Sequence, residues 1–138
     1  MALEWTPKLA VGHPLIDSQH QELFRRFDEL LEACQQARGK DRIESLLEFL
    51  GTYVVTHFQA EERLMDRHDY PGAEAHKAEH RYFTGRLDLL REDLRSGGAS
   101  SQLVISTNQT LLNWIIKHIK NVDVEFGAFL RKRGLANA

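Results

Sequence analysis

The sequence predicts an all-α fold: an up-down-up-down antiparallel four-helix bundle with an irregular N-terminal arm and a short C-terminal helix. Apolar residues recur every three or four positions along most of the chain, and no stretch alternates with the period of a strand. The prolines are confined to Pro7, Pro14 and Pro71, so the stretches between them can form long helices. Four such helices joined by short loops pack as antiparallel neighbours.

The first helix is expected over 18–37, with Asp17 or Ser18 as its N-cap. Its apolar stripe consists of Leu23, Phe27, Leu30, Leu31 and Cys34. The segment "ARGKD" (37–41) ends this helix, and a second is expected over 42–66. The stripe of the second helix consists of Ile43, Leu46, Leu47, Leu50, Val54 and Phe58.

A Pro-Gly turn, "RHDYPG" (67–72), leads into a third helix over 72–95, and "SGGAS" (96–100) leads into a fourth over 101–119. The tail can form one further amphipathic helix through Phe126, Phe129 and Leu130. We therefore expect one domain over 1–138, made of an arm (1–17), a bundle (18–119) and a tail (120–138).

The composition excludes several classes of function. With 138 residues the chain can bury a core, and a net charge of −2 with interspersed signs gives no basis for binding nucleic acid. No apolar run is long enough to span a membrane, and the N-terminus does not resemble a secretory signal. The single cysteine, Cys34, excludes an internal disulfide and fits a reducing compartment, so we expect a cytoplasmic protein. The sequence leaves the oligomeric state open, with a monomer expected.

Histidines are frequent, with seven in the chain, and most of them fall on the apolar faces of the predicted helices. His57 and Glu61 are four residues apart on the second helix, and His76 and His80 are four apart on the third, so each pair shares a face. His20 on the first helix and His118 on the fourth also lie beside apolar neighbours.

These six residues also share one depth. In an up-down bundle, the start of the first helix, the end of the second, the start of the third and the end of the fourth meet at one end, where all six lie. A single histidine of this kind is usually satisfied by neighbouring carbonyls or water. Five imidazoles and a carboxylate buried together, without cysteine, instead indicate a metal site.

Asp123 has two possible roles on spacing alone. It follows His118 by five residues, which on a regular helix turns its side chain away by about 140°. It can join the site if the helix ends or widens into a π-bulge there. Otherwise it can cap the segment "VEFGAF".

Four segments together resemble the hemerythrin family, specifically its single-domain bacterial members, the bacteriohemerythrins. They are "VGHPLIDSQHQELF" (11–24), "HFQAEE" (57–62), "HKAEHRYF" (76–83) and "WIIKHIKNVD" (114–123). The resemblance covers nearly the whole chain and implies a non-haem di-iron site. It implies that His76, His80 and His118 bind one iron, that His20 and His57 bind the other, and that Glu61 and Asp123 bridge both.

With an oxo or hydroxo bridge, this ligand set fills all but one of the positions of two octahedral irons. The open position belongs to the iron with two histidines, and an open position distinguishes a reactive site from a structural one. The resemblance therefore implies reversible binding of dioxygen, held end-on as a hydroperoxide on that iron, and a carrier, storage or delivery protein rather than an enzyme. A protein that delivers dioxygen would have an oxygen-consuming enzyme as its partner.

The residues expected to line the oxygen pocket are apolar and include no evident general base or nucleophile. They are Leu23, Phe58, Phe83, Trp114, Ile115 and Ile119. At Ile115 the family usually has leucine, so the resemblance does not extend to the shape of the pocket. His13 occupies a variable slot and is not expected to be a ligand. Glu62 lies one step off the ligand face and is either solvated or an acceptor for a ligand histidine.

Two other functions use the same site. A ferritin-like di-iron oxidase or peroxidase is the nearest enzyme, but such sites use Glu-x-x-His motifs, and no histidine here has Glu three residues before it. A sensor of oxygen or redox state, acting through a partner protein, is the second alternative. Storage of iron and handling of nitric oxide also remain open.

Overall fold

The computed structural model describes residues 5–135, and all regular secondary structure in that range is helical. A short 3-10 helix, η1 (Pro7–Leu9), precedes α1 (Pro14–Gln35), α2 (Gly39–Arg67) and α3 (Ala73–Gly97). A fourth helical segment then runs through α4 (Ser101–Thr107), η2 (Asn108–Leu112), α5 (Asn113–Lys117), η3 (His118–Asp123) and α6 (Val124–Lys132). The predicted all-α class is confirmed. Positions 1–4 of the expected arm and 136–138 of the expected tail lie outside the described residues.

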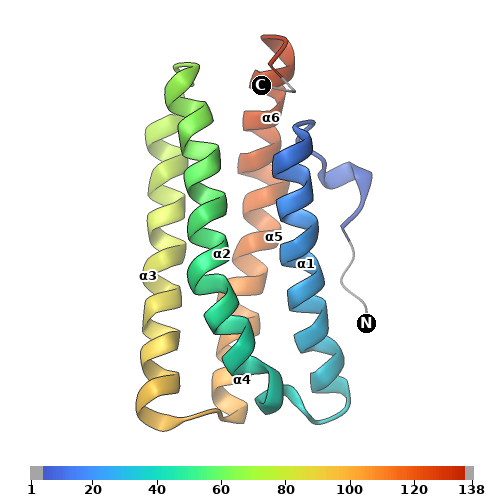
Figure 1. Cartoon of the computed structure of the whole chain (residues 1–138), viewed down its shortest axis with the longest axis vertical. Coiled ribbons are helices and arrows are strands. Elements are labelled where there is room, and N and C mark those ends of the chain that lie inside the picture. The colour runs from blue at the N-terminus through green and yellow to red at the C-terminus, as the bar shows by residue number, and fades with distance from the viewer. Residues whose placement is uncertain (1–4, 136–138) are drawn as a thin grey trace.

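The four long segments lie alongside one another (Figure 1). The turns after α1 and α3 lie at one end of the molecule, and the turn after α2 lies at the other, beside the start of α1 and the end of α6 (Figure 1). Within residues 5–135, no helix is long and apolar enough to cross a bilayer.

The first helix begins earlier than expected. α1 starts at Pro14 rather than at 18, with His13 at the N-cap position. Proline is favoured in the first helical turn because its missing N–H needs no partner there. Asp17 is therefore not the cap; its carboxylate accepts hydrogen bonds from the backbone N–H groups of Val11 (2.8 Å) and Gly12 (3.2 Å). The arm thus ends at residue 13, and Asp17 ties it to α1.

The fourth helical segment also differs from the expectation. A short C-terminal helix is present as α6, but no turn separates it from α5, and the helical path continues past residue 119. Residues 118–123 form a π-helix, η3, that carries the helical path directly into α6. The two π-helices therefore have different positions: η2 lies inside the expected fourth helix, and η3 crosses its expected end at 119.

The apolar core consists of two clusters. The larger includes Leu23 of α1 and Ile115 of α5, and the smaller includes Ile16 of α1 and Phe126 of α6. Along α1 the order is Ile16, His20, Leu23, so the predicted ligand lies between the two clusters. Packed apolar layers therefore stand on both sides of the histidines.

A close approach of backbones at α6 gives a first prediction. A Cβ added at Gly127 would lie 2.2 Å from the carbonyl oxygen of Val11, whereas one added at Gly85 on α3 would have no heavy atom within 4 Å. We expect Gly127→Ala to lower the free energy of unfolding by about 1–3 kcal/mol through overpacking. Gly85→Ala is the matched control, and should raise it by up to about 1 kcal/mol. Urea unfolding measures both, and a Gly127→Ala chain as stable as the unaltered one would show that the arm does not pack against α6.

Candidate metal centre

The seven predicted ligand residues are all buried, each at most 3 % exposed. They come from four helical segments: His20 from α1, His57 and Glu61 from α2, His76 and His80 from α3, and His118 and Asp123 from η3. So many ionisable groups in a protein interior are unfavourable unless they pair with one another or bind a metal.

Local helix geometry explains how pairs of these residues reach one point. On α2 and α3 the four-residue spacing puts both members of each pair on the inner face. Asp123 is brought in by η3, because hydrogen bonds in a π-helix join residues five apart and return the chain to the same side after five steps. The His118 Nε2 atom lies 3.1 Å from Asp123 Oδ1, and the Asp123 side chain does not cap α6. The sequence left two roles open for Asp123, and the structure places it in the histidine cluster rather than at a helix cap.

The ligand atoms form two groups that share both carboxylates. The first group is Glu61, His76, His80, His118 and Asp123, and the second is His20, His57, Glu61 and Asp123. Within each group the candidate ligand atoms all lie within 4.8 Å of one another.

Each carboxylate turns one oxygen to each group. Glu61 Oε1 lies 3.1 Å from His80 Nε2, whereas Glu61 Oε2 lies 3.5 Å from His57 Nε2. Asp123 Oδ1 lies 2.9 Å from His76 Nε2, whereas Asp123 Oδ2 lies 3.1 Å from His20 Nε2. This is the arrangement expected of carboxylates that bridge two cations.

The unpaired atoms show that the cluster suits a metal. Among the described residues, both oxygens of Glu61 and of Asp123 are buried without a hydrogen-bond partner, as is Nε2 of His76, His80 and His118. His20 Nε2 and His57 Nε2 face each other at 3.0 Å. Adjacent ligands of an octahedral metal with bonds of about 2.1 Å lie about 3.0 Å apart. The cluster is therefore able to hold metal ions.

The outer nitrogens of two histidines are held by carboxylates. His80 Nδ1 lies 2.7 Å from Glu62 Oε2, and His118 Nδ1 lies 3.2 Å from Glu79 Oε1. An ionised carboxylate only accepts hydrogen bonds, so Nδ1 donates the proton and Nε2 keeps its lone pair for a metal. Each contact therefore fixes the tautomer suited to ligation.

Without a metal, protons take its place among the carboxylates. Burial opposes the charging of His20, but its contacts with Asp123 and Glu61 prevail and raise its pKa to about 9; the same balance raises the pKa of His76 to about 9. Burial dominates at His57 and lowers its pKa to about 4. A metal that enters at neutral pH must displace protons from His20 and His76.

Apolar side chains cover the histidines on the core side. Five of the six expected pocket residues are buried in the larger core cluster, and Trp114 packs against it. The Phe58 ring stacks on His80 with centroids 3.8 Å apart, and the Trp114 ring stacks on His118 at 4.4 Å. Both aromatic rings therefore contact the group that has three histidines.

A match to a known family agrees with this arrangement. Residues 11–130 match the family described as "Hemerythrin HHE cation binding domain". The chain belongs to the hemerythrin family. The resemblance seen in the sequence is thus confirmed over most of the chain.

Named relatives in the hemerythrin family come from bacteria and animals. The chain is 30% identical over 124 residues to a bacteriohemerythrin of Pseudomonas paraeruginosa, covering 90% of this chain and 78% of that protein. It is 31% identical over 114 residues to a bacteriohemerythrin of Methylococcus capsulatus, covering 83% and 85%. It is 25% identical over 122 residues to a myohemerythrin of Sipunculus nudus, covering 88% of each.

Sequence reasoning missed two residues around this hemerythrin site. They are Gln19, whose side chain Oε1 lies 2.6 Å from His57 Nδ1, and Glu79, whose Oε1 lies 3.2 Å from His118 Nδ1. Each is adjacent in sequence to a predicted ligand or one turn from it, and that was the available signal. Of the alternatives for Glu62, the structure has the contact with a ligand histidine. His13, not expected to be a ligand, belongs to neither group.

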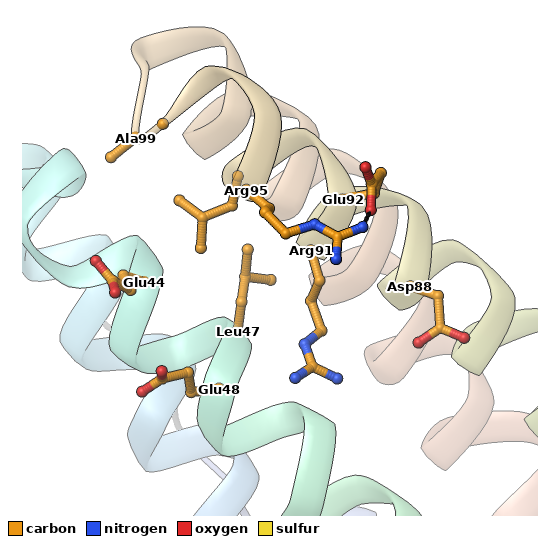
Figure 2. A pocket seen from close by; sticks show the side chains of 10 residues that line it. Glu44, Leu47, Glu48, Asp88, Arg91, Glu92, Arg95 and Ala99 are labelled. Carbon is orange, nitrogen blue, oxygen red and sulfur yellow. Dashed lines mark hydrogen bonds and ion pairs between the residues drawn. The ribbon is translucent and has the colours of Figure 1, made fainter.

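A surface hollow of about 550 Å³ lies away from the hemerythrin site, between the first half of α2 and the end of α3 (Figure 2). Glu44 and Glu48 line it from α2, and Arg91 and an ion pair between Arg95 and Glu92 line it from α3. Its lining contains no histidine and none of the seven cluster residues, so it is not part of the metal centre.

Proposed function

We propose that the chain binds dioxygen reversibly at a centre of two non-haem irons. The observation that carries the proposal is the pair of ligand groups that share Glu61 and Asp123. One group has three histidines and the other has two, which leaves fewer protein ligands on the second iron. Membership of the hemerythrin family supports iron as the metal and oxygen as the ligand.

In this proposal, His76, His80 and His118 hold one iron and His20 and His57 hold the other. Glu61 and Asp123 would each offer one oxygen to each ion, as the distances above allow. When bound, the two ferrous ions supply the electrons and the open coordination position that dioxygen requires. The protein's task is then to hold both ions at a fixed separation and to keep the open position dry.

Apolar side chains next to the histidines are proposed to keep the open coordination position dry. Leu23, Phe83, Ile115 and Ile119 are each at most 2 % exposed, and Phe58 is 4 % exposed. Such side chains offer no hydrogen bond to water or to a polar substrate, but they tolerate a small, weakly polar molecule. We infer that they line the oxygen pocket and retard the loss of reduced oxygen from it. The surrounding scaffold is proposed to be a single up-down-up-down antiparallel bundle that acts as a monomer.

Optical spectroscopy of the iron-loaded chain tests this function. The reduced protein, prepared without air, should gain a visible absorption band when oxygen is added and lose it when oxygen is removed. The spectrum should persist through repeated cycles, and elemental analysis should find two irons per chain. A chain without iron, or a reduced form with an unchanged spectrum under oxygen, would refute the proposal.

The same sample separates the carrier from the alternatives. Turnover of hydrogen peroxide with a reducing substrate would indicate a peroxidase instead, and rapid one-way oxidation would indicate a sensor or an enzyme. A carrier should show neither.

A further inference from the structure

Side chains of unequal charge support the two groups of histidines from outside. Two carboxylates contact the outer nitrogens of the three-histidine group. Glu62 Oε2 lies 2.7 Å from His80 Nδ1, and Glu79 Oε1 lies 3.2 Å from His118 Nδ1. The contact is made from α2 to α3 in the first case and from α3 to η3 in the second. A metal ion held by this group would therefore be surrounded by more negative charge than Glu61 and Asp123 alone provide.

Behind the two-histidine group the corresponding contact is uncharged. His57 Nδ1 lies 2.6 Å from the amide oxygen of Gln19 on α1. The other histidine of this group, His20, has a buried Nδ1 with no hydrogen-bond partner among residues 5–135. A metal ion held here would thus receive no added negative charge through its histidines.

The difference matters because a carboxylate behind an imidazole raises the basicity of the ligating nitrogen, and a more basic ligand stabilises a more highly charged metal. An amide oxygen can orient the ring equally well but adds no charge. The effect is reduced by solvent, since the Glu62 side chain is 30% exposed and the Glu79 side chain 45% exposed.

We propose that Glu62 and Glu79 are positioning residues that lower the reduction potential of the iron bound by His76, His80 and His118 below that of its neighbour. This inference rests on the proposed di-iron function. With iron bound, an external oxidant would remove the first electron from the ion held by His76, His80 and His118. The second electron would come from the ion held by His20 and His57, which Gln19 supports. The order of oxidation would thus be set by Glu62, Glu79 and Gln19, which contact the histidines and are not themselves ligands.

Potentiometric titration of the iron-loaded chain tests the order, because the two irons should lose their electrons in two resolved steps. Glu62→Gln and Glu79→Gln keep an oxygen that can accept the Nδ1 proton but remove the charge. Each substitution should raise the potential of the first oxidation step by about 59 mV, which corresponds to a tenfold change in the equilibrium constant for one electron. Gln19→Glu should lower the potential of the second oxidation step by a similar amount, so the difference between the two potentials should become smaller.

The matched control is Glu74→Gln, which makes the same charge change on an exposed residue of the first turn of α3. It should leave both steps in place. A readout independent of redox chemistry is the affinity for Co²⁺, which we expect to fall about tenfold in Glu62→Ala, where the orienting contact is lost, and less in Glu62→Gln.

The inference would be overturned if Glu62→Gln and Glu79→Gln had the same two potentials as the control Glu74→Gln. Binding of a single metal ion per chain would also overturn it. Oxygen binding is not needed for the titration. Two resolved steps with the expected shifts, in a chain that fails to bind oxygen reversibly, would therefore refute the proposed function and leave the inference standing. Reversible oxygen binding with unchanged potentials in the Glu62→Gln and Glu79→Gln chains would support the proposed function and refute the inference.

Discussion

A Glu61→Gln chain is expected to lose both metal ions, although the substitution barely changes the volume of the side chain. The reason is that Glu61 Oε1 lies with His76 and His80 whereas Oε2 lies with His57 and His20. An amide nitrogen cannot take the place of a carboxylate oxygen as a ligand, and the loss of charge weakens the attraction for both cations. We expect the affinity for each ion to fall at least about 100-fold, measured as metal content by elemental analysis and by competition with a chelator.

Two histidine variants sharpen the result. His80→Ala removes a residue that belongs to one ligand group only, so it should weaken the binding of one ion before the other. His68→Ala is the control, because His68 follows α2 at its C-cap and belongs to neither group, and this chain should keep both ions. Full metal content in Glu61→Gln, or equal losses in Glu61→Gln and His80→Ala, would contradict the shared position of Glu61.

Much of the fold follows from the sequence because helical periodicity is strong and local. The apolar stripe of 42–66 lies inside α2, which runs only a few residues further at its start. Helix boundaries follow less directly from the sequence, since they depend on competition between neighbouring signals. Pro14 begins α1 ahead of both expected caps, Asp17 and Ser18, and the Asp17 carboxylate accepts a hydrogen bond from the backbone of the arm.

The cluster itself could be anticipated because four-residue spacing and depth along a bundle both follow from helix geometry. Asp123 could not be placed by that reasoning, since its position depends on η3, and a π-helix has no reliable signature in a single sequence. The contacts of Gln19 and Glu79 were missed for a different reason. They join different helices, so their distances depend on how the helices are rotated against one another, which the sequence pattern fixes only coarsely. That the seven residues bind iron stays a prediction.

Removal of the metal is expected to cost the fold a large part of its stability. Ions bound to the native chain but not to the unfolded chain stabilise it by mass action, by about 4 kcal/mol when free metal exceeds the dissociation constant 1,000-fold. Chelation should therefore lower the midpoint of thermal unfolding substantially, measured by circular dichroism. Glu61→Gln supplies the control, because a chelator should hardly change a chain that already lacks the metal. An unaltered chain whose midpoint did not respond to the chelator would show that the cluster is stable without ions.

The metal-stripped chain should also acquire a pH optimum. The pKa values of His20 and His76 are raised to about 9 in the fold, above about 6.5 when unfolded, so their contribution is complete below pH 6.5 and is lost as the pH rises towards 9. His57 acts oppositely: its pKa is lowered to about 4, so its contribution is present above pH 6.5 and is lost as the pH falls towards 4. The unfolding midpoint of the stripped chain should therefore peak near pH 6.5. Bound metal replaces the protons on His20 and His76 and should remove the decline between pH 6.5 and 9, so an equal decline in both forms would contradict the placement of these histidines at the metal.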